Sequence, residues 1–171
     1  NDSLTQAGAV YIYTRSGSTW SQQAYLKASN PTGSDWFGSS VSISSDGNTL
    51  AVGSIYEDGS SAGINGTDND SMTNTGAVYI YTRSGTVWSQ QAYVKASNPT
   101  VHDYFGHSVS VSSDGNTLAV GAWSEDGSSA GINGADNDSM LSAGAAYVFT
   151  RSVSTWTQQA YVKASYPSAS D

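Results

Sequence analysis

The chain repeats itself with a period of 68 residues, and this feature constrains its fold more than any other. The segment GAVYIYTRSG at Gly8 returns unchanged at Gly76 and returns as GAAYVFTRSV at Gly144. Residues 36–68 and 104–136 are identical at 26 of 33 positions, with no insertion or deletion between them. Such similarity indicates one structural unit copied in tandem, so the fold of one unit determines the fold of the chain.

Each unit reads as four short strands, because β-branched and aromatic residues come in runs of five to eight that are bounded by Gly, Asp, Asn and Pro. In the first full unit we expect strands at 37–44, 49–54, 77–83 and 88–96. The pair Asp46-Gly47 predicts a tight hairpin turn, which needs a positive φ, between the first two of them.

Both faces of the third predicted strand are apolar. Val78 and Ile80 point to one side, and Tyr79 and Tyr81 point to the other. A strand with this pattern is covered by neighbouring sheets on both sides. We therefore expect the sheets of successive units to stack face to face.

The fourth predicted strand carries Gln90, Gln91 and Lys95, which suggest a more solvated, outermost position where a lysine discourages edge-to-edge aggregation. The basic side chains recur with the same strict period. This recurrence favours structural pairing or edge protection over a binding patch for the whole basic complement: Arg15, Arg83, Arg151, Lys27, Lys95 and Lys163.

A four-stranded sheet repeated every 68 residues fits either a blade of a β-propeller or a coil of a β-solenoid. Solenoid coils repeat every 20 to 30 residues, roughly, whereas a longer unit made of consecutive hairpins favours the propeller. The sequence therefore predicts an all-β fold made of four-stranded antiparallel β-propeller blades in tandem.

Three segments follow from the period: a half blade of third and fourth strands at 1–35 and two full blades at 36–103 and 104–171. About two and a half blades cannot close a ring, which takes at least about four. We therefore expect other copies of the chain, or further repeats of a longer parent chain, as partners.

Composition excludes several functions. With 14 acidic and 6 basic side chains, the net charge of −8 would repel a phosphate backbone, so we expect no nucleic-acid partner. No apolar run approaches the ~20 residues that cross a bilayer, so we expect no membrane insertion. The absence of Cys excludes disulfides, thiolate metal sites and a cysteine nucleophile. A Ser-, Thr-, Gly- and Asn-rich chain with few lysines is more typical of a secreted protein.

These motifs resemble the FG-GAP repeats of the integrin α-subunit propeller and of its bacterial envelope and secreted relatives. The FG pair is Phe37-Gly38 and Phe105-Gly106, followed by SSVSIS and HSVSVS. LAVGSIYED and LAVGAWSED take the GAP position without its proline, and GAVYIY fits the family's GxVYVY. The resemblance covers the entire chain. It implies a propeller blade, an extracellular or cell-surface location, and a role in cell adhesion or ligand binding without catalysis.

One departure from the family concerns calcium. Integrin-type repeats often carry a calcium loop between the first two strands of a blade, but here residues 44–48 contain a single carboxylate, that of Asp46. Calcium takes about six to eight oxygen ligands. The family's metal site is therefore not expected in this hairpin.

The longest connection of each unit, at 57–75 and 125–143, is a better candidate for calcium, because Asp-x-Asp spacing with Asn and Gly supplies hard oxygen ligands and a flexible backbone. The alternative is a solvated acidic loop whose Asp and Asn side chains form local turns. The candidate ligands are Glu57, Asp58, Asp68, Asp70, Glu125, Asp126, Asp136 and Asp138.

The long loops should share a face with residues 30–35 and 98–103, because the second-to-third and fourth-to-first connections of a meander emerge on the same side. In the integrin relatives this face binds ligands, so the resemblance implies a protein or glycan ligand there. A purely structural array is the alternative.

Seven large aromatic residues should pack between adjacent blades. They are Trp20, Trp88, Trp156, Phe37, Phe105, Tyr79 and Tyr81.

The two histidines, His102 and His107, have Ser34 and Ser39 as their counterparts one period earlier. Because a site built into the repeat would recur, surface variation is favoured over a lone zinc site. N-glycosylation triplets begin at Asn1, Asn65, Asn69 and Asn137, and they arise often in chains rich in Ser and Asn.

No enzymatic activity is expected. The chain has no Cys, no recurring His and no GxSxG, and the nominal acid pair Asp68 and Asp70 lies in a loop, which is weak evidence for catalysis. The sequence predicts a non-catalytic extracellular adhesion, ligand-binding or scaffolding module with no cofactor other than calcium. The alternative is a structural subunit that self-assembles head to tail into an extracellular filament.

Overall fold

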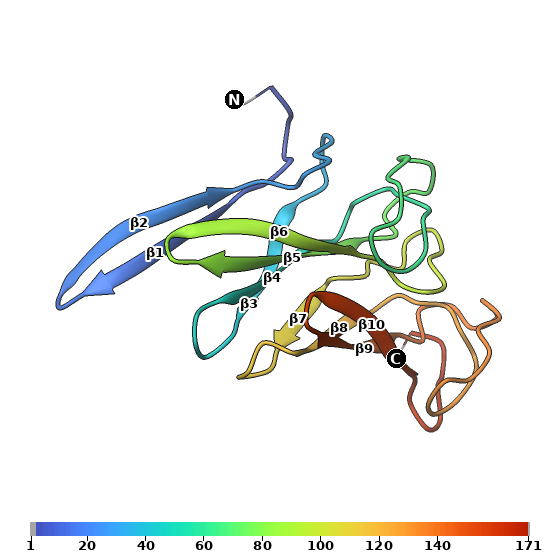
Figure 1. The fold of residues 1–171 in the computed structure, drawn as a ribbon. Coiled ribbons are helices and arrows are strands. Elements are labelled where there is room, and N and C mark those ends of the chain that lie inside the picture. Colours follow the sequence, from blue (N-terminus) through green and yellow to red (C-terminus); the bar gives the residue numbers. More distant parts are fainter. Residues whose placement is uncertain (1–2, 171) are drawn as a thin grey trace.

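The computed structural model describes residues 3–170, which fold into strands and loops (Figure 1). No helix that could cross a membrane occurs in this part of the chain. The strands, in chain order, are β1 (Val10–Ser16), β2 (Thr19–Leu26), β3 (Phe37–Ile43), β4 (Thr49–Ser54), β5 (Ala77–Ser84), β6 (Val87–Val94), β7 (Ser108–Val111), β8 (Thr117–Ala122), β9 (Ala145–Ser152) and β10 (Thr155–Val162).

The strands form three antiparallel sheets that follow one another along the chain (Figure 1). We call the β1–β2 hairpin the half blade, the β3-β4-β5-β6 sheet blade 1, and the β7-β8-β9-β10 sheet blade 2. Each four-stranded sheet is a meander, and none of the described sheets closes on itself. This architecture confirms the prediction of open, tandem four-stranded blades.

The short hairpins have the turn chemistry that the sequence predicts. Gly47 has φ of 68° in the β3–β4 turn, a left-handed conformation that glycine adopts without a steric cost. Asp46 accepts hydrogen bonds from the Ser44 hydroxyl at 2.6 Å and from the Asn48 N–H at 3.0 Å. Its single carboxylate therefore closes the turn.

Two apolar clusters join the sheets. The first lies between the half blade and blade 1 and includes Phe37, Tyr79 and Tyr81, with Val10 and Ile12 of the half blade packed against it. The second joins blades 1 and 2 and contains Val78, Ile80, Val94, Phe105, Leu118, Tyr147, Phe149 and Trp156. Alternate residues of β5 therefore face opposite sheets, as expected from their alternation.

A bulge in the outermost strand aims a glutamine at the next blade. The register between β5 and β6 passes from Tyr81 opposite Gln90 to Ile80 opposite Ala92, so that Gln91 is the extra residue. The Gln91 Oε1 accepts a hydrogen bond of 2.9 Å from the Trp156 indole N–H of blade 2. Gln23 of the half blade makes the same 2.9 Å bond with Trp88.

The expectation of inter-blade packing fails for one of the three periodic tryptophans. Trp156 is only 3% exposed, whereas Trp20 is 63% exposed. Trp88 has an intermediate exposure and packs against the cluster that the half blade shares with blade 1. The difference arises because Trp88 and Trp156 each meet a glutamine of a preceding sheet, and Trp20 lies on the outer face of the half blade.

The expectation of a solvated fourth strand is wrong at Lys95. This side chain is 1% exposed and pairs with the carboxylate of Glu57, at the base of the long loop. Lys163 of blade 2 is likewise buried and pairs with Glu125. Of the two explanations that periodicity allowed for the basic residues, structural pairing therefore holds for these lysines.

Candidate functional site

Each long loop is anchored to its blade by a buried glutamate. Glu57 is 1% exposed and accepts hydrogen bonds from the Lys95 ammonium and, at 2.5 Å, from the Tyr93 hydroxyl. In blade 2 Glu125 accepts hydrogen bonds from Lys163 and, at 2.6 Å, from Tyr161. Burial raises the pKa of Glu57 and lowers the pKa of Lys95, and ion pairing between the two opposes both shifts.

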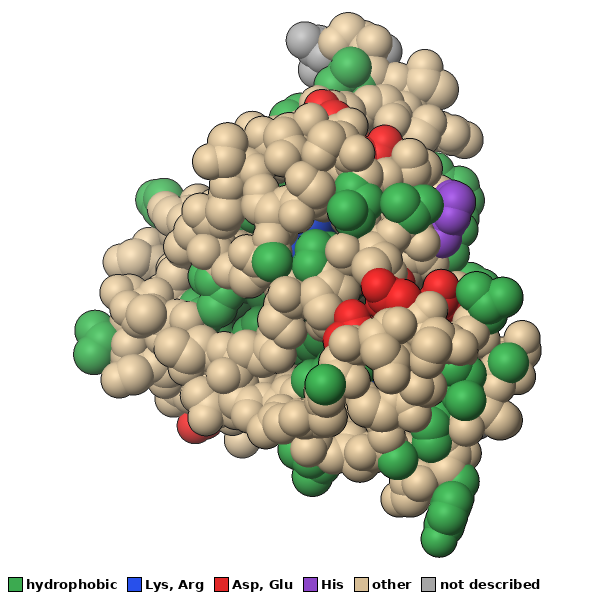
Figure 2. Space-filling view, turned by 90° about the vertical axis from the view of Figure 1, so that its right-hand side faces the viewer, with side chains coloured by type: hydrophobic (Ala, Val, Ile, Leu, Met, Phe, Trp, Pro, Cys, Tyr) green, Lys and Arg blue, Asp and Glu red, His purple; other side chains and the backbone are tan. Residues whose placement is uncertain are grey.

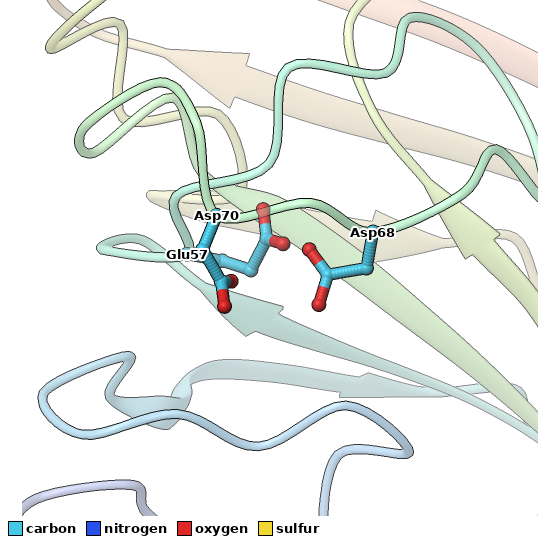
Figure 3. Close-up of side chains that lie close together, drawn as sticks. All are labelled: Glu57, Asp68 and Asp70. Atoms are coloured by element: carbon cyan, nitrogen blue, oxygen red, sulfur yellow. The ribbon is translucent and has the colours of Figure 1, made fainter.

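The long loop of blade 1 brings three of the predicted metal ligands together. Carboxylate oxygens of Glu57, Asp68 and Asp70 lie within 4.8 Å of one another (Figure 3). Asp68 Oδ1 is a buried atom without a hydrogen-bond partner. Burial raises the pKa of Asp70, and the neighbouring charge of Asp68 raises it further. Because both oxygens of Glu57 already accept hydrogen bonds, few free oxygens remain for a cation that takes about six to eight.

Blade 2 arranges the equivalent residues differently. Glu125 Oε1 accepts a hydrogen bond of 3.1 Å from the Asn98 amide, and the Asp138 N–H lies 3.4 Å from Asp136 Oδ1. Within residues 3–170, a group of three metal-ligating side chains occurs only in blade 1. The acidic cluster is therefore not a property of both repeats.

The other two predicted ligands hold the loop backbone. Asp58 Oδ1 accepts a hydrogen bond of 2.7 Å from the Asn74 N–H, and Asp126 Oδ1 accepts one of 2.7 Å from the Ser142 N–H. Each bond joins residues 16 apart, so these aspartates tie the two ends of the long loop together, and they do not form the local turns that were the alternative to metal binding.

The described glycosylation candidates also contribute their amide oxygens to the loops. Asn65 accepts from the Tyr93 N–H at 2.9 Å, Asn69 from the Ser60 N–H at 3.0 Å, and Asn137 from the Ser128 N–H at 3.1 Å. The fourth candidate, Asn1, lies outside the described residues. The loops are thus ordered by their own side chains.

The connections between blades lie on the same face as the long loops. The Tyr79 hydroxyl of β5 donates to Asn30 at 2.8 Å, and the Tyr147 hydroxyl of β9 donates to Asn98 at 2.9 Å. Figure 2 shows this side of the molecule, on which acidic side chains gather near the middle and histidine lies at the edge beside hydrophobic side chains. We call it the loop face.

A row of aromatic rings crosses the loop face, and sequence reasoning missed it. We call it the aromatic strip: Trp36, Tyr56, Tyr104 and Trp123. Its successive ring centroids are 4.7, 5.6 and 5.4 Å apart, and the last two rings stack with an interplanar angle of 7°. Trp36 is 44% exposed and Trp123 is 53% exposed. The strip therefore joins both blades and presents ring surface to solvent.

Part of the strip could have been found in the sequence. An aromatic residue precedes Phe-Gly in both blades, as Trp36 and Tyr104. The other two rings occupy different positions in their repeats, since the counterpart of Tyr56 is Ser124 and that of Trp123 is Ile55. A search for recurring residues passes over them.

The backbone holds the recurring aromatic residues in a conformation that large side chains rarely adopt. Trp36 and Tyr104 both have φ of 55°, in the left-handed region. Such strained residues cluster at binding and catalytic sites, where the surrounding structure maintains them.

A buried aspartate precedes each of these strained residues. Asp103 accepts hydrogen bonds from the Thr100 N–H at 2.7 Å and from its hydroxyl at 2.8 Å, and Asp35 binds Thr32 in the same way. Burial raises the pKa of both carboxyls, that of Asp103 to about 7. The aspartates thus fix the turn that presents the rings.

Beside the strip lies a cavity of about 280 Å³. Trp36 and Tyr56 line it together with the carboxylate-bearing Asp58 and the polar residues Gln6 and Asn74. An aromatic wall next to hydrogen-bonding groups suits a ligand that has both apolar and polar surface.

The two histidines lie at the same end of the strip. The ring of His102 is 5.9 Å from that of Tyr104, and the ring of His107 is 6.2 Å from that of Trp123. Both histidines therefore border aromatic side chains of the loop face.

Comparison with known proteins finds one family that matches most of the chain. A family model described as FG-GAP repeat matches residues 20–81 and again residues 88–149. The two matches begin 68 residues apart, as the internal period requires. No curated protein matches the chain.

Proposed function

The chain belongs to the FG-GAP repeat family, and from this premise we propose that it is a non-catalytic ligand-binding module that works outside the cell or at its surface. The observation that carries this proposal is the aromatic strip. Exposed aromatic side chains provide large, rigid contact surfaces, and they dominate the binding energy of many interfaces.

The rigidity of the strip supports a binding role. Its rings project from turns that buried aspartates and inter-blade hydrogen bonds hold, so a ligand does not have to order them. The ligand class that fits is a glycan or a protein segment, since both combine apolar faces with hydrogen-bonding groups.

A binding assay on the double variant Trp36→Ala/Tyr56→Ala tests the proposal. Retention on immobilised chitin, mannan and collagen should identify a surface that the wild-type chain binds, and the double variant should lose at least about tenfold in affinity for that surface. Tyr166→Ala is the matched control, because Tyr166 is 93% exposed and lies outside the strip. Equal binding by the double variant and the wild-type chain would refute a role for the strip.

Head-to-tail self-assembly is the second candidate, and the two ends of the stack favour it. The outer face of the half blade exposes Tyr11, Tyr13, Trp20 and Tyr25, the counterparts of residues that face the half blade from blade 1. The far face of blade 2 carries Ala146, Val148 and Val162, the counterparts of Val78, Ile80 and Val94 in the cluster between the blades. The two ends of the stack therefore carry the two surfaces that already meet between the blades of one chain. If the end of one copy contacted the start of the next, the contact would be heterologous, that is, head to tail.

Multi-angle light scattering over a range of chain concentrations tests self-assembly. We expect the mass to rise with concentration, and we expect Trp20→Ala and Gln159→Ala to suppress the rise. Gln159 is the counterpart of Gln91, so it would bind Trp20 of a second copy as Gln91 binds Trp156. Val153→Ala is the control, because Val153 is 95% exposed at a hairpin tip. A constant monomer mass would rule self-assembly out.

A further inference from the structure

The Phe105-Gly106 pair, which leads into the first strand of blade 2, binds to blade 1 through a specific set of residues. Phe105 forms a parallel β-bridge with Gly76, and its N–H donates to the carbonyl of Thr75 at 2.9 Å. The Gly106 carbonyl then accepts a hydrogen bond of 2.7 Å from the Ser40 hydroxyl. A side chain cannot be added at these glycines, because a Cβ on Gly76 would lie 2.1 Å from the Phe105 oxygen.

Gly53 completes this receiving site. A Cβ on Gly53 would lie 2.2 Å from the Gly106 oxygen, so the incoming carbonyl rests directly on the glycine. The half blade receives blade 1 in a related manner, through a parallel bridge between Gly8 and Phe37. A Cβ on Gly8 would also lie 2.1 Å from the oxygen of that phenylalanine. Phe-Gly is thus the pair by which each blade joins the preceding one.

Blade 2 contains the same receiving residues, which we call the Phe-Gly socket: Ser108, Gly121, Ala143, Gly144 and Ala145. They line a cavity of about 340 Å³. An added Cβ on Gly144 would come no closer than 3.3 Å to another atom, in contrast to the clash at Gly76. An added Cβ on Gly121 would meet only the Ser108 side chain.

The chain approaches the socket along the same course as in the other units. Ser34, His102 and Ser170 are spaced by the repeat, and their N–H groups donate to the carbonyls of Thr5, Thr73 and Leu141 respectively. The backbone before the socket therefore has the register that leads to a bound Phe-Gly pair in blade 1.

We propose that the Phe-Gly socket of blade 2 binds the first strand of another FG-GAP repeat, an extended segment in which Asp-aromatic-Phe-Gly precedes alternating Ser and Val. The carbonyl of its glycine would accept a hydrogen bond from the Ser108 hydroxyl, as the Gly106 carbonyl does from Ser40. Its phenylalanine would form a parallel β-bridge with Gly144, as Phe105 does with Gly76. This is strand addition, in which main-chain hydrogen bonds give affinity and a side-chain pocket gives specificity. Trp123 of the aromatic strip borders the same cavity, but the contacts proposed here are made by Ser108, Gly121 and Gly144, which lie outside the strip, so the proposal goes beyond the proposed function.

The test uses a labelled peptide with the sequence of residues 99–112, PTVHDYFGHSVSVS, added to the full chain. Fluorescence anisotropy should show saturable binding. Gly121→Ala should weaken it by at least about tenfold, because the methyl group takes the place of the incoming carbonyl. A peptide with the change Phe105→Ala should bind at least as poorly, and Ser108→Ala should weaken binding less.

Gly33→Ala is the matched control, because its added Cβ would meet only the Thr5 oxygen at 3.7 Å. Circular dichroism melting should show that the Gly121→Ala variant is folded. The double variant Ser108→Ala/Gly121→Ala removes the Ser108 hydroxyl, which is the one group that the added methyl would approach closely. Equal binding by Gly121→Ala and wild type, or no binding by the wild-type chain, would overturn the proposal. Self-association abolished by Gly121→Ala without peptide binding would assign the socket to a second copy instead. Trp36→Ala/Tyr56→Ala should retain peptide binding, which separates this result from the test of the loop face.

Discussion

Single residues decide how the long loops are held, and the buried Glu57–Lys95 pair is the clearest case. Two charges removed from water are tolerated only when each is paired and hydrogen-bonded. Here Tyr93 supplies a further donor to Glu57, and the Lys95 ammonium also donates to the Thr75 hydroxyl. A polar network thus fastens the loop to the end of β6.

We predict that Lys95→Met lowers the free energy of unfolding by about 3–5 kcal/mol, because it leaves the Glu57 carboxylate buried without its partner. Glu57→Gln/Lys95→Met should cost less than Lys95→Met alone. Lys27→Met is the matched control, since Lys27 is the counterpart one period earlier and donates to a backbone carbonyl, that of Gly8, at 2.7 Å. Urea denaturation measures all three. Equal losses for Lys95→Met and Lys27→Met would contradict the role of the ion pair.

A second prediction at the residue scale concerns how stability depends on pH, and it rests on Asp103. Burial raises its pKa from 3.8 to about 7, so its protonated form favours the folded state. The stability it contributes is present below pH 3.8 and is lost as the pH rises through about 7. Urea denaturation between these pH values should show a smaller fall in stability for Asp103→Asn than for wild type. Hydrogen bonds from Ser112 and Asn116 lower the pKa of Asp114, so the stability that Asp114 contributes is lost only as the pH falls below 3.8. Asp114→Asn should therefore leave the change in stability between pH 3.8 and about 7 as it is in wild type.

At the scale of elements, the bulged fourth strand links one blade to the next. The bulge turns Gln91 out of the β5–β6 ladder and toward Trp156, over which Arg151 lies at 5.3 Å from the ring centroid. The same arrangement recurs with Gln23, Trp88 and Arg83. An irregularity of the strand is therefore part of the blade interface.

The three tryptophans of this interface should differ in energetic weight although their local sequences are nearly identical. Trp156→Ala should cost about 3–5 kcal/mol, because the side chain is almost fully buried. Trp20→Ala should cost less than about 1 kcal/mol, and Trp88→Ala should lie between them. Thermal or urea unfolding gives the ranking. Three equal values would mean that burial in the stack does not determine their contributions.

The long loop of blade 1 is the element to examine for calcium. Since Lys95 neutralises Glu57 and local hydrogen bonds order the loop, we expect melting curves with calcium and with chelator to coincide. Asp68→Asn is the control, and it should leave both curves together. A rise in melting temperature with calcium that Asp68→Asn abolishes would instead establish a metal site at Glu57, Asp68 and Asp70.

For the whole molecule, position in the stack determines how well each sheet is covered. Every residue of β4 is buried, because blade 1 lies between the half blade and blade 2, whereas β2 has no buried residue. Nearly identical repeats thus have different environments. A sheet covered on both faces opens only with the global unfolding of the molecule, and a two-stranded sheet is marginal in water.

Hydrogen exchange should reveal this gradient. We predict the slowest exchange for amides of β4 and β5, intermediate rates in blade 2, and the fastest exchange in β1 and β2. The periodic positions provide an internal control, since Ile12, Ile80 and Val148 occupy the same place in their repeats. Equal protection at these three positions would show that the sheets do not depend on their neighbours.

The repeat by itself determined the fold class, the four strands of each unit and the opposite directions of alternating residues in β5. These follow from local chemistry: a two-residue side-chain period and turns such as Asp46-Gly47 require no knowledge of distant residues. The same reasoning placed the acidic loops on one face of the blades. It singled out the aspartates and asparagines of these loops as candidate calcium ligands and glycosylation sites, and it gave turn formation by Asp and Asn side chains as the alternative to calcium.

Only the tertiary structure decided which copies of a repeated residue are buried and which side chains meet. Lys95 looks like a surface lysine until Glu57, 38 residues away in sequence, is brought to it. The aromatic strip joins Tyr56 to Tyr104 from different repeats, and the Phe-Gly socket is recognised by comparison with the one that Phe105 occupies. The physical reason is that burial and contact depend on the neighbouring sheet, and identical sequences at different places in a stack have different neighbours.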